Sequence, residues 1–515
     1  MDAHPAPIAI VGAGPGGLAA AVLLAASGAR VVVYEAQPEI GGRTGRLTKD
    51  GFAFDRGPTF FMMPYVLDEI FAAAGARLGE RVTLRRLDPM YRLLIGRADG
   101  SITRIDAVQD LDRMAAQLDS VRPGDGDGFR RFMQDNRTKL RLMTPILRSP
   151  IRGIGDLIGR EGLRAAPWVT PWRSLHDSLG RYFRDDAVRL AMSFQSKYLG
   201  MSPFECPSLF SILPFIEYEY GIWHPTGGCH ALMTALAGVA VELGVEIRCG
   251  EPVTELRFEG RRVSALRAGG RWHEHRHVVL NADATWAMKA LIPEALRGRE
   301  TDAAIDSRRY SCSTFMMYLG LRGEVDLPHH TIYTSREYRR NLADIGEGRL
   351  STDPSIYVCN PSRIDPTLAP PGCSSLYVLM PTANTTAPID WDAERDRLRD
   401  LAYGQVERVL GAEGLRGRII SETTFTPADW RGMNINHGAT FNLAHTLRQM
   451  LHRRPQHRLP GFEGLWLVGG GTHPGSGLPV IFLSAQITAR LLCGELGLPC
   501  AADAARPSRS LVGAA

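Results

Sequence analysis

Closely spaced glycines near the start of the chain are the first residues whose type and spacing could do chemistry. Gly12, Gly14 and Gly17 follow a short apolar run at residues 8–11 and precede an Ala/Leu-rich segment. Glycines at this spacing permit a tight turn, let backbone N–H groups approach a pyrophosphate, and let a helix pack closely on a strand. The N-terminus of that helix then faces the phosphate charge. The pattern predicts a dinucleotide-binding loop.

An acidic residue, Glu35, follows the glycine loop at the distance that dinucleotide binding requires. Residues 31–34 form a second apolar run that Glu35 closes, close to the separation of about 20 residues at which an acid bonds the ribose hydroxyls. Strand, glycine turn, helix, strand and acid therefore occur in the order of a βαβ unit. The motif alone does not separate NAD from FAD. At 515 residues the chain is long enough for two or three packed units.

The next segment resembles the superfamily of flavin-dependent amine oxidases and carotenoid desaturases. It reads EIGGRTGRLTKDGFAFDRGPTF and contains Gly42, Arg43, Gly57, Pro58 and Thr59. The resemblance implies that these residues extend an FAD site, with Arg43 meeting the pyrophosphate through a fixed planar charge. It implies further FAD contacts from Val253, Asn281, Gly471, Thr472, Gly475 and Leu478.

Such a cofactor domain is assembled from distant segments, and helix and strand patterns at 231–266, 277–286 and 464–492 agree with this. We expect an α/β fold with a two-dinucleotide-binding-type, glutathione-reductase-like FAD domain, an inserted mixed α+β substrate domain and a helical membrane-docking region. The expected segments are 1–90, 211–300 and 456–499 for FAD binding, 91–210 for substrate and membrane docking, 301–455 for the substrate domain and 500–515 for a disordered tail.

Three further blocks resemble bacterial-type phytoene desaturases and related carotenoid desaturases, including those that use diapophytoene. They read IWHPTGGCHALMTAL, LPHHTIY and GLWLVGGGTHPGSGLPVIFLSAQITA. The resemblance implies a desaturase of a linear polyprenoid such as phytoene, diapophytoene or a squalene-type chain. Substrate length (C30 or C40) and the choice between desaturation and end-group oxidation stay open. Two alternatives also stay open: amine or porphyrinogen oxidation on the same fold, and a non-enzymatic prenyl-binding carrier.

The implied reaction requires few ionisable side chains. Allylic C–H groups are far too weakly acidic for a protein base alone, so a flavin takes hydride at N5 and the delocalised cation then loses a proton. The resemblance places proton-handling residues in IGREGLRAAP, at Glu161 and Arg164, with Asp156 as a competing acid. His473 lies in the glycine turn expected beside the isoalloxazine and could orient or polarise it.

The expected substrate also predicts a membrane surface. Burying a methylene is worth ~0.8 kcal/mol, so thirty or forty carbons lose on the order of 20–30 kcal/mol on leaving lipid for water. Residues 137–173 interleave eight Arg and Lys with apolar residues including Trp168 and Trp172. That pattern is typical of a peripheral docking surface, although an ordinary solvated helix is the alternative. Residues 58–71 are expected to line a substrate tunnel or the core.

The composition excludes other classes. A formal net charge of +5 is mild, and no aromatic-and-basic signature of nucleic-acid binding occurs. Eight scattered cysteines without zinc or C-x-x-C spacing favour reduced thiols, hence a cytoplasmic protein at the membrane periphery. We expect no transmembrane helix and no metal; His273, His275 and His277 would share a solvated face if they lie in one strand. Oxygen or a quinone is the expected electron acceptor.

Overall fold

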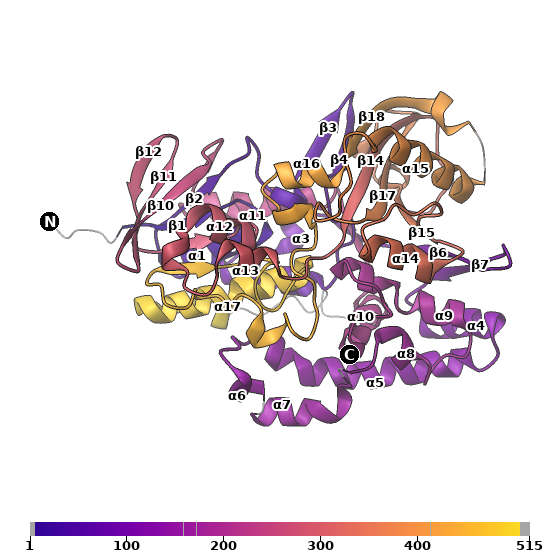
Figure 1. Ribbon diagram of the computed structural model, residues 1–515, viewed down its shortest axis with the longest axis horizontal. Helices are drawn as coiled ribbons and strands as arrows, with labels where there is room; N and C mark the ends of the chain where they lie inside the picture. Colours follow the sequence, from indigo (N-terminus) through magenta and orange to yellow (C-terminus); the bar gives the residue numbers. More distant parts are fainter. Residues whose placement is uncertain (1–5, 158, 171, 412–413, 505–515) are drawn as a thin grey trace.

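The computed structural model describes residues 6–504, except 158, 171, 412–413 and the side chains of Arg160 and Glu161. A parallel sheet covered by helices lies at one end of the molecule, and a large antiparallel sheet lies at the other. Helices α4, α5, α8 and α9 lie below the large sheet, and α6 and α7 lie below the half of the molecule that holds the parallel sheet (Figure 1). The two sheets and this layer of helices position the candidate site.

Apolar runs from three distant parts of the chain build the parallel sheet. Its order is β19-β13-β1-β2-β9, and every neighbouring pair is parallel. The strands are β1 Ile8–Val11, β2 Val31–Glu35, β9 Glu246–Cys249, β13 Val278–Leu280 and β19 Leu465–Leu467. Helices α1 (Pro15–Ala26), α11 (His230–Glu242) and α17 (Leu478–Leu496) share one hydrophobic core on this sheet. Burial on both faces explains why the central strands read as continuous Val, Ile and Leu.

The second sheet has seven strands, in the order β18-β14-β17-β16-β15-β6-β7, and only β15 and β6 pair in parallel. Its strands are β6 Tyr91–Gly96, β7 Ile102–Ala107, β14 Ser313–Arg322, β15 His330–Thr334, β16 Ile356–Cys359, β17 Cys373–Thr382 and β18 Ile419–Phe425. Helix α15 (Arg395–Leu410) packs its apolar side chains against those of the sheet. Alternation of buried and exposed residues is weak here because helices or loops cover both faces.

Smaller sheets flank these two. They are β10 Val253–Glu259, β11 Arg262–Ala268 and β12 Arg271–Glu274; β3 Arg46–Lys49 with β4 Phe52–Asp55; and β5 Leu84–Arg86 with β8 Trp223–Pro225. The expectation that His273, His275 and His277 share one solvated strand face is wrong. Strand β12 ends at Glu274, and His275 is buried with its imidazole bonded to the Tyr34 hydroxyl and the Pro7 carbonyl.

The helical layer contains α4 Leu111–Val121, α5 Asp125–Leu147, α6 Ile154–Leu157, α7 Arg160–Ala165, α8 Leu175–Leu179, α9 Asp186–Ala191 and α10 Ile212–Tyr220. The remaining helices are α2 Pro64–Ala73, α3 Leu78–Arg81, α12 Ala284–Leu291, α13 Asp302–Asp306, α14 Tyr338–Gly346 and α16 Pro427–Gly432. Two basic residues of the expected docking segment do not face outward. Lys139 is buried and donates to the Ser211 hydroxyl at 2.7 Å, and Arg148 pairs with Glu69 at 2.9 Å.

Residues 501–504 are more ordered than expected. Residues 501–504 form helix α18 (Ala501–Ala504), in which Ala502 is buried against the first core and the Ala501 N–H donates to the Ser27 hydroxyl at 3.0 Å. The expected disordered tail therefore does not begin at residue 500; residues 505–515 lie outside the described part. Packing on α1 and α2 explains this order, which local composition does not reveal.

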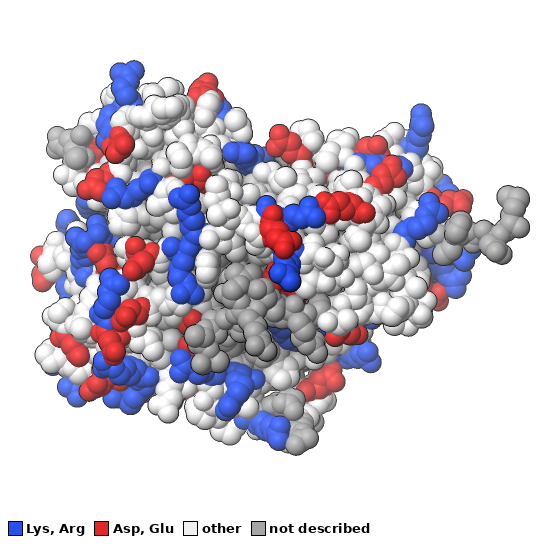
Figure 2. Space-filling model, turned by 180° about the vertical axis from the view of Figure 1, so that it is seen from behind, with Lys and Arg blue, Asp and Glu red and all other residues white. Residues whose placement is uncertain are grey.

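One described helix, α17, is long and apolar enough to cross a membrane by length and composition. Most of its apolar window, 61%, is buried within the protein, where it packs in the core of the parallel sheet. Charged side chains are distributed over the surface: in Figure 2, Lys and Arg are interspersed with Asp and Glu across the face shown.

Candidate cofactor site and active centre

The glycine loop joins β1 to α1 under tight steric limits. A Cβ at Gly17 would lie 2.1 Å from the Gly12 carbonyl oxygen, so no larger residue fits without moving the helix. The Asn281 side chain holds the loop in place, because its amide donates a hydrogen bond to the Gly12 carbonyl oxygen at 3.0 Å. Gly12 has a φ of +101°, a left-handed conformation that favours glycine. The predicted loop residues and Asn281 thus lie together at the carboxyl end of β1.

Two helix N-termini remain without side-chain caps beside this loop. The N-cap residues are Gly14 for α1 and Gly477 for α17, and neither offers a side-chain acceptor. The first N–H groups of a helix have no partner within the helix, and they attract anions. Leu478, the first residue of α17, is buried in the first core, and its expected contact with FAD stays a prediction.

Glu35 closes β2 and is held in place by backbone groups. It is 6% exposed, and its carboxylate accepts N–H groups of Ala13 at 2.7 Å and Gln37 at 2.9 Å. Its own carbonyl accepts the Glu251 N–H at 2.9 Å, two residues before Val253 opens β10. The acid and Val253 therefore lie on the same side of the loop.

Arg43 joins the N-terminal segment to residues almost four hundred positions later. Its guanidinium donates to the Thr440 carbonyl at 2.6 Å and to the Asn442 side-chain oxygen at 2.7 Å. Burial lowers the pKa of Arg43, and nearby Asp283 opposes that change. Gly42 approaches the glycine loop: a Cβ on it would lie 3.3 Å from the Gly14 Cα.

The turn at residues 57–59 packs against the segment that contains Arg43. A Cβ at Gly57 would lie 2.5 Å from the Arg43 carbonyl oxygen, so residues 57–59 follow directly against the Gly-Gly-Arg segment. Pro58 is half-buried and Thr59 is buried, with its hydroxyl 2.6 Å from that of Tyr357. The predicted residues Gly57, Pro58 and Thr59 thus lie next to the candidate dinucleotide site.

The glycine turn after β19 is also closely packed. A Cβ at Gly471 would lie 2.8 Å from that of Ala284, and one at Gly475 would lie 2.6 Å from the His445 ring. The Thr472 hydroxyl donates to the Gly469 carbonyl at 2.6 Å. His473 is 1% exposed, and burial lowers its pKa to about 4, so the imidazole is neutral at pH 7.

The predicted proton-handling residues lie on the surface helices α6 and α7. Asp156 is exposed, and its carboxylate accepts the N–H groups of Arg152 at 2.6 Å and Gly153 at 3.1 Å. Arg164 is exposed in the last turn of α7, and the Glu161 backbone belongs to the same helix, but its side chain lies outside the described residues. The structure gives Asp156 a local structural role; catalysis by Asp156, Glu161, Arg164 or His473 stays a prediction.

An aromatic cluster lies directly after Thr59. The half-buried Phe60 ring stacks on His330, with centroids 4.1 Å apart and an interplanar angle of 12°, and it also contacts Tyr198 and Tyr357. Its neighbour Phe61 is fully buried in the first core. Residues 58–71 therefore divide between the core and a partly open aromatic surface beside the loop.

A carboxyl group lies buried next to this cluster. Glu217, on α10, is 0% exposed and accepts hydrogen bonds from the Tyr91 hydroxyl at 2.8 Å and the Gln195 amide at 2.9 Å. Burial raises its pKa to about 7, against the opposing effect of these hydrogen bonds. Sequence reasoning missed Glu217 because nothing in PFIEYEYG distinguishes the buried acid from the half-buried Glu219.

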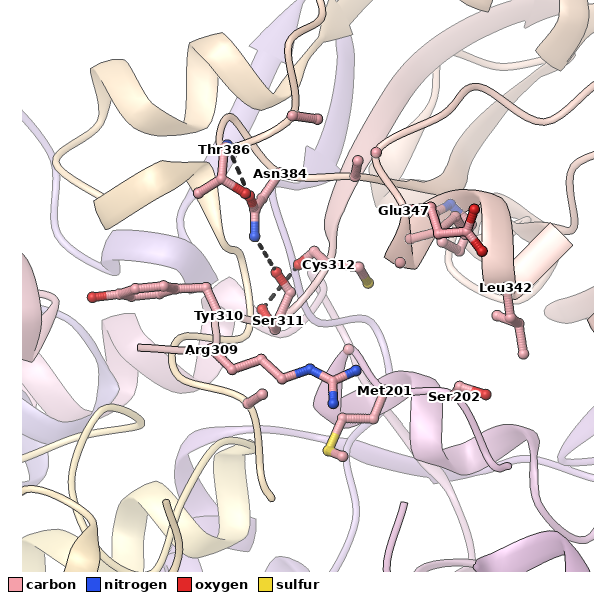
Figure 3. Close-up of a pocket in the computed structure, with 18 of the residues that line it drawn as sticks. Met201, Ser202, Arg309, Tyr310, Ser311, Cys312, Leu342, Glu347, Asn384 and Thr386 are labelled. Carbon is pink, nitrogen blue, oxygen red and sulfur yellow. Dashed lines mark hydrogen bonds between the residues drawn. The ribbon is translucent and has the colours of Figure 1, made fainter. Parts of the chain in front are cut away.

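A pocket of about 430 Å³ opens between helix α14 and the segments that precede β14 and follow β17 (Figure 3). Ser311, Cys312, Asn384 and Thr386 line one side, where the Asn384 amide donates to the Ser311 carbonyl at 2.8 Å. Arg309 and Glu347 are among the charged lining residues. Hydrocarbon in this pocket would displace water from charged groups at a cost, so the pocket does not match the long apolar channel that a polyprenoid needs.

Known proteins that resemble this chain identify its family. Residues 15–493 match the family described as flavin containing amine oxidoreductase. The chain is 40% identical to a 4,4'-diapophytoene desaturase (4,4'-diapolycopene-forming) of Methylomonas sp, over 94% of each chain. It is 42% identical to an all-trans-zeta-carotene desaturase of Myxococcus xanthus, over 95% of this chain and 94% of that protein. This chain belongs to the carotenoid desaturase family.

Solved structures related to this family member agree on the fold. An oxidoreductase from Methanosarcina mazei superposes with a TM-score of 0.62 at 18% identity, over 93% of this chain and 98% of that one. Cyclohexylamine oxidase from Brevibacterium oxydans superposes with a TM-score of 0.59 at 16% identity, over 96% and 100%. The expected α/β architecture, with a parallel cofactor-binding sheet and a mixed substrate-domain sheet, is therefore confirmed.

Proposed function

We propose that this carotenoid desaturase binds FAD and removes hydrogen from a linear polyprenoid precursor that it takes from a membrane surface. The observation that carries the proposal is the identity of 40–42% with desaturases of diapophytoene and zeta-carotene over nearly the whole chain. A phytoene desaturase (lycopene-forming) of Pseudescherichia vulneris, 35% identical, extends the relatives to phytoene. The substrate class is therefore proposed as a linear C30 or C40 carotenoid precursor.

The loop residues fit a flavin dinucleotide. The facing glycines Gly14 and Gly42 leave room that a Cβ would fill, and two uncapped helix N-termini supply N–H groups for an anion. In this proposal Glu35 would bond ribose hydroxyls, and Arg43 would bring a positive charge to the pyrophosphate. Bound FAD would supply a two-electron acceptor for hydride. The protein's own part is to hold the polyene against it and to exclude water.

The surface around α6 and α7 supports membrane docking. Among the described residues, Ile154, Leu163 and Trp172 are large apolar side chains that are 64–78% exposed. Beneath them a small core that includes Met143, Ile146, Ile151 and Ala165 holds the segment in place. Arg152 and Arg173 are exposed in the same stretch. Exposed Trp and Leu flanked by arginines favour the headgroup region of an anionic bilayer.

A second pocket adjoins this surface. Its volume is about 560 Å³, and its walls include Pro150 and Arg152 from the docking segment and Leu491 from α17. His457 also lines it, and the His457 ring lies 6.1 Å from that of His473. The pocket therefore borders both the proposed membrane surface and a neighbour of His473, and its lining also includes the charged residues Arg458 and Glu495.

Two experiments test the proposal. Holoprotein in anionic liposomes that contain phytoene or diapophytoene, under anaerobic conditions, is expected to lose oxidised-flavin absorbance while a product absorbing at longer wavelength forms. If the protein turns over an amine or a porphyrinogen without liposomes and does not turn over phytoene or diapophytoene, the result would support the alternative chemistry. Purified protein without flavin would support the carrier.

Docking is tested by liposome co-sedimentation of the double variant Leu163→Ala, Trp172→Ala. Removing two interfacial side chains is expected to weaken partitioning at least about tenfold, since each is worth more than about 1 kcal/mol. Trp272→Ala is the matched control, because Trp272 is a 40% exposed tryptophan on strand β12, outside the surface formed around α6 and α7. Equal binding by the double variant and the control would refute this docking surface.

A further inference from the structure

Six side chains form one unbroken hydrogen-bonded chain through the interior beside the aromatic cluster. In order they are Thr59, Tyr357, His330, His329, His224 and Asp365. The successive donor–acceptor distances are 2.6, 2.6, 3.0, 3.0 and 2.9 Å. Both nitrogens of each imidazole are used within the chain. We call these six residues the histidine relay.

Hydrogen-bond direction in the histidine relay is fixed at its far end. The Asp365 carboxylate accepts not only from His224 but also from the Gly227 N–H at 2.6 Å and from the Thr367 hydroxyl at 2.6 Å. Burial would raise the pKa of Asp365, but these hydrogen bonds together lower it below its ordinary value. An ionised Asp365 requires His224 to donate through Nε2, so its Nδ1 accepts from His329 when the ring is neutral.

Repeating this step gives one consistent arrangement. His329 and His330 each carry hydrogen on Nε2, Tyr357 donates to the Nδ1 of His330, and Thr59 donates to Tyr357. Burial holds the pKa values of His329 and His330 well below their ordinary range, so both rings are neutral. A second arrangement has one additional proton and the four hydrogen bonds from Thr59 to His224 reversed, whereas Nε2 of His224 still donates to Asp365. It leaves His224 as an imidazolium against the Asp365 carboxylate. The two arrangements differ by one proton only.

The relay opens at one end. Its histidines and Asp365 are at most 5% exposed, whereas Tyr357 is half-buried beside the half-buried Phe60. Thr59 follows Gly57, which packs against Arg43 at the candidate cofactor site. The end formed by Thr59, which is 7% exposed, and the half-buried Tyr357 therefore lies toward the candidate cofactor site, and the acidic end lies in the interior.

We propose that the histidine relay accepts the proton that the polyprenoid loses. This rests on the proposed function: after hydride has left for the cofactor, an allylic C–H bond of the substrate cation breaks and its electron pair becomes the new π bond. The proton enters at the Thr59 oxygen, and each member passes its own proton to the next. The chain ends with imidazolium at His224 beside the Asp365 carboxylate, so no net charge is left in the interior.

The same path runs backward to reset the relay. Reduction of the electron acceptor, a quinone or oxygen, consumes two electrons and two protons. The stored proton returns through Tyr357 and Thr59 for that step. Asp365 needs no separate exit to solvent, in agreement with its 1% exposure.

A bound metal is the competing use of these residues. Donor atoms of His329, His330 and Cys359 lie within 4.8 Å of one another. Each ring nitrogen of the two histidines already has a hydrogen-bond partner in the relay, which favours proton transfer. Metal analysis of purified holoprotein separates the two uses: the relay requires less than stoichiometric metal, and one tightly held transition metal per chain would overturn it.

Nitrogen-15 NMR of histidine-labelled holoprotein tests the arrangement without substrate. Neutral rings protonated on Nε2 are expected for His224, His329 and His330. A charged ring, or hydrogen on Nδ1, in the resting protein would overturn the proposal. Because no turnover is involved, this result is independent of whether the proposed substrate is correct.

The variant His329→Gln tests proton transfer. The glutamine amide can replace the donor and the acceptor of the His329 ring, but it cannot take up a proton on one side and release another on the other side. Flavin content is expected to stay at the wild-type level while single-turnover product formation falls at least about tenfold, because proton transfer to a positioned group contributes about 10²–10⁴-fold. The solvent deuterium isotope effect of the wild type should be lost as well.

Tyr333→Phe is the matched control. Tyr333 lies on the same strand, β15, and its buried hydroxyl bonds Arg408 outside the relay, so product formation should stay at the wild-type rate. Wild-type rates in His329→Gln would overturn the relay. Absence of product from the wild type with either polyene would instead refute the proposed function.

Discussion

Glu217 allows the electrostatics of the buried centre to be measured directly, through the variant Glu217→Gln. Burial raises the pKa of this carboxyl from 4.5 to about 7. The folded protein therefore binds the proton more tightly than the unfolded chain does. Stability contributed by the protonated acid is present in full below pH 4.5 and is lost as the pH rises to about 7.

The size of the effect follows from the pKa shift. At about 1.4 kcal/mol per pKa unit, the change from 4.5 to about 7 is worth on the order of 3 kcal/mol. Glutamine does not titrate, and its side-chain oxygen can accept the hydrogen bonds that the Tyr91 hydroxyl and the Gln195 amide now donate to Glu217. The free energy of unfolding of wild type minus that of Glu217→Gln is therefore expected to fall by roughly 3 kcal/mol between pH 4.5 and pH 7.

Urea unfolding followed by tryptophan fluorescence, at half-unit steps from pH 4.5 to pH 8, measures this difference. The control is Glu242→Gln on the exposed end of α11, where a hydrogen bond from Arg81 lowers the pKa of the acid. Its difference should be small and of opposite sign. A flat profile for Glu217→Gln, or a rise with pH, would refute the account of this carboxyl as a desolvated acid.

Two further substitutions test the cofactor loop and the helical layer. Gly17→Ala places a methyl group 2.1 Å from the Gly12 carbonyl and should abolish flavin absorbance in purified protein, whereas Gly238→Ala, which faces open space in α11, should retain it. Lys139→Met removes a buried ammonium whose pKa burial lowers to about 8. Its stability advantage over wild type in urea should shrink as the pH rises from 8 to 10.5, because wild type then loses the charge; an advantage independent of pH would contradict this explanation.

The parts of the site that local sequence determines could be predicted. Gly12, Gly14 and Gly17 follow one another within a single strand–turn–helix, so their spacing alone indicates the loop. Glu35 ends the next strand, at a separation that the motif fixes. The distant segments of the parallel sheet were placed by resemblance, since nothing in residues 278–280 shows that they pair with β1.

Features created by tertiary packing could not be predicted. Lys139 reads as a basic residue of a docking segment, and its burial depends on which face of the 23-residue helix α5 meets α10. The pair His329 and His330 was visible as LPHHTIY, but His224 and Asp365 lie far away in sequence. A hydrogen-bonded chain of this kind has no period or spacing from which it could be read.

The order of strands in the parallel sheet has a consequence for synthesis. The glycine loop leaves the ribosome early, yet the sheet gains its edge strand β19 and its covering helix α17 only when residues 465–496 emerge. At about 5–20 residues per second, the nascent loop waits for roughly 20–90 s without its neighbours. During that interval α1 lacks the apolar partner that α17 provides in the folded protein, so the cofactor-binding sheet is completed only late in translation.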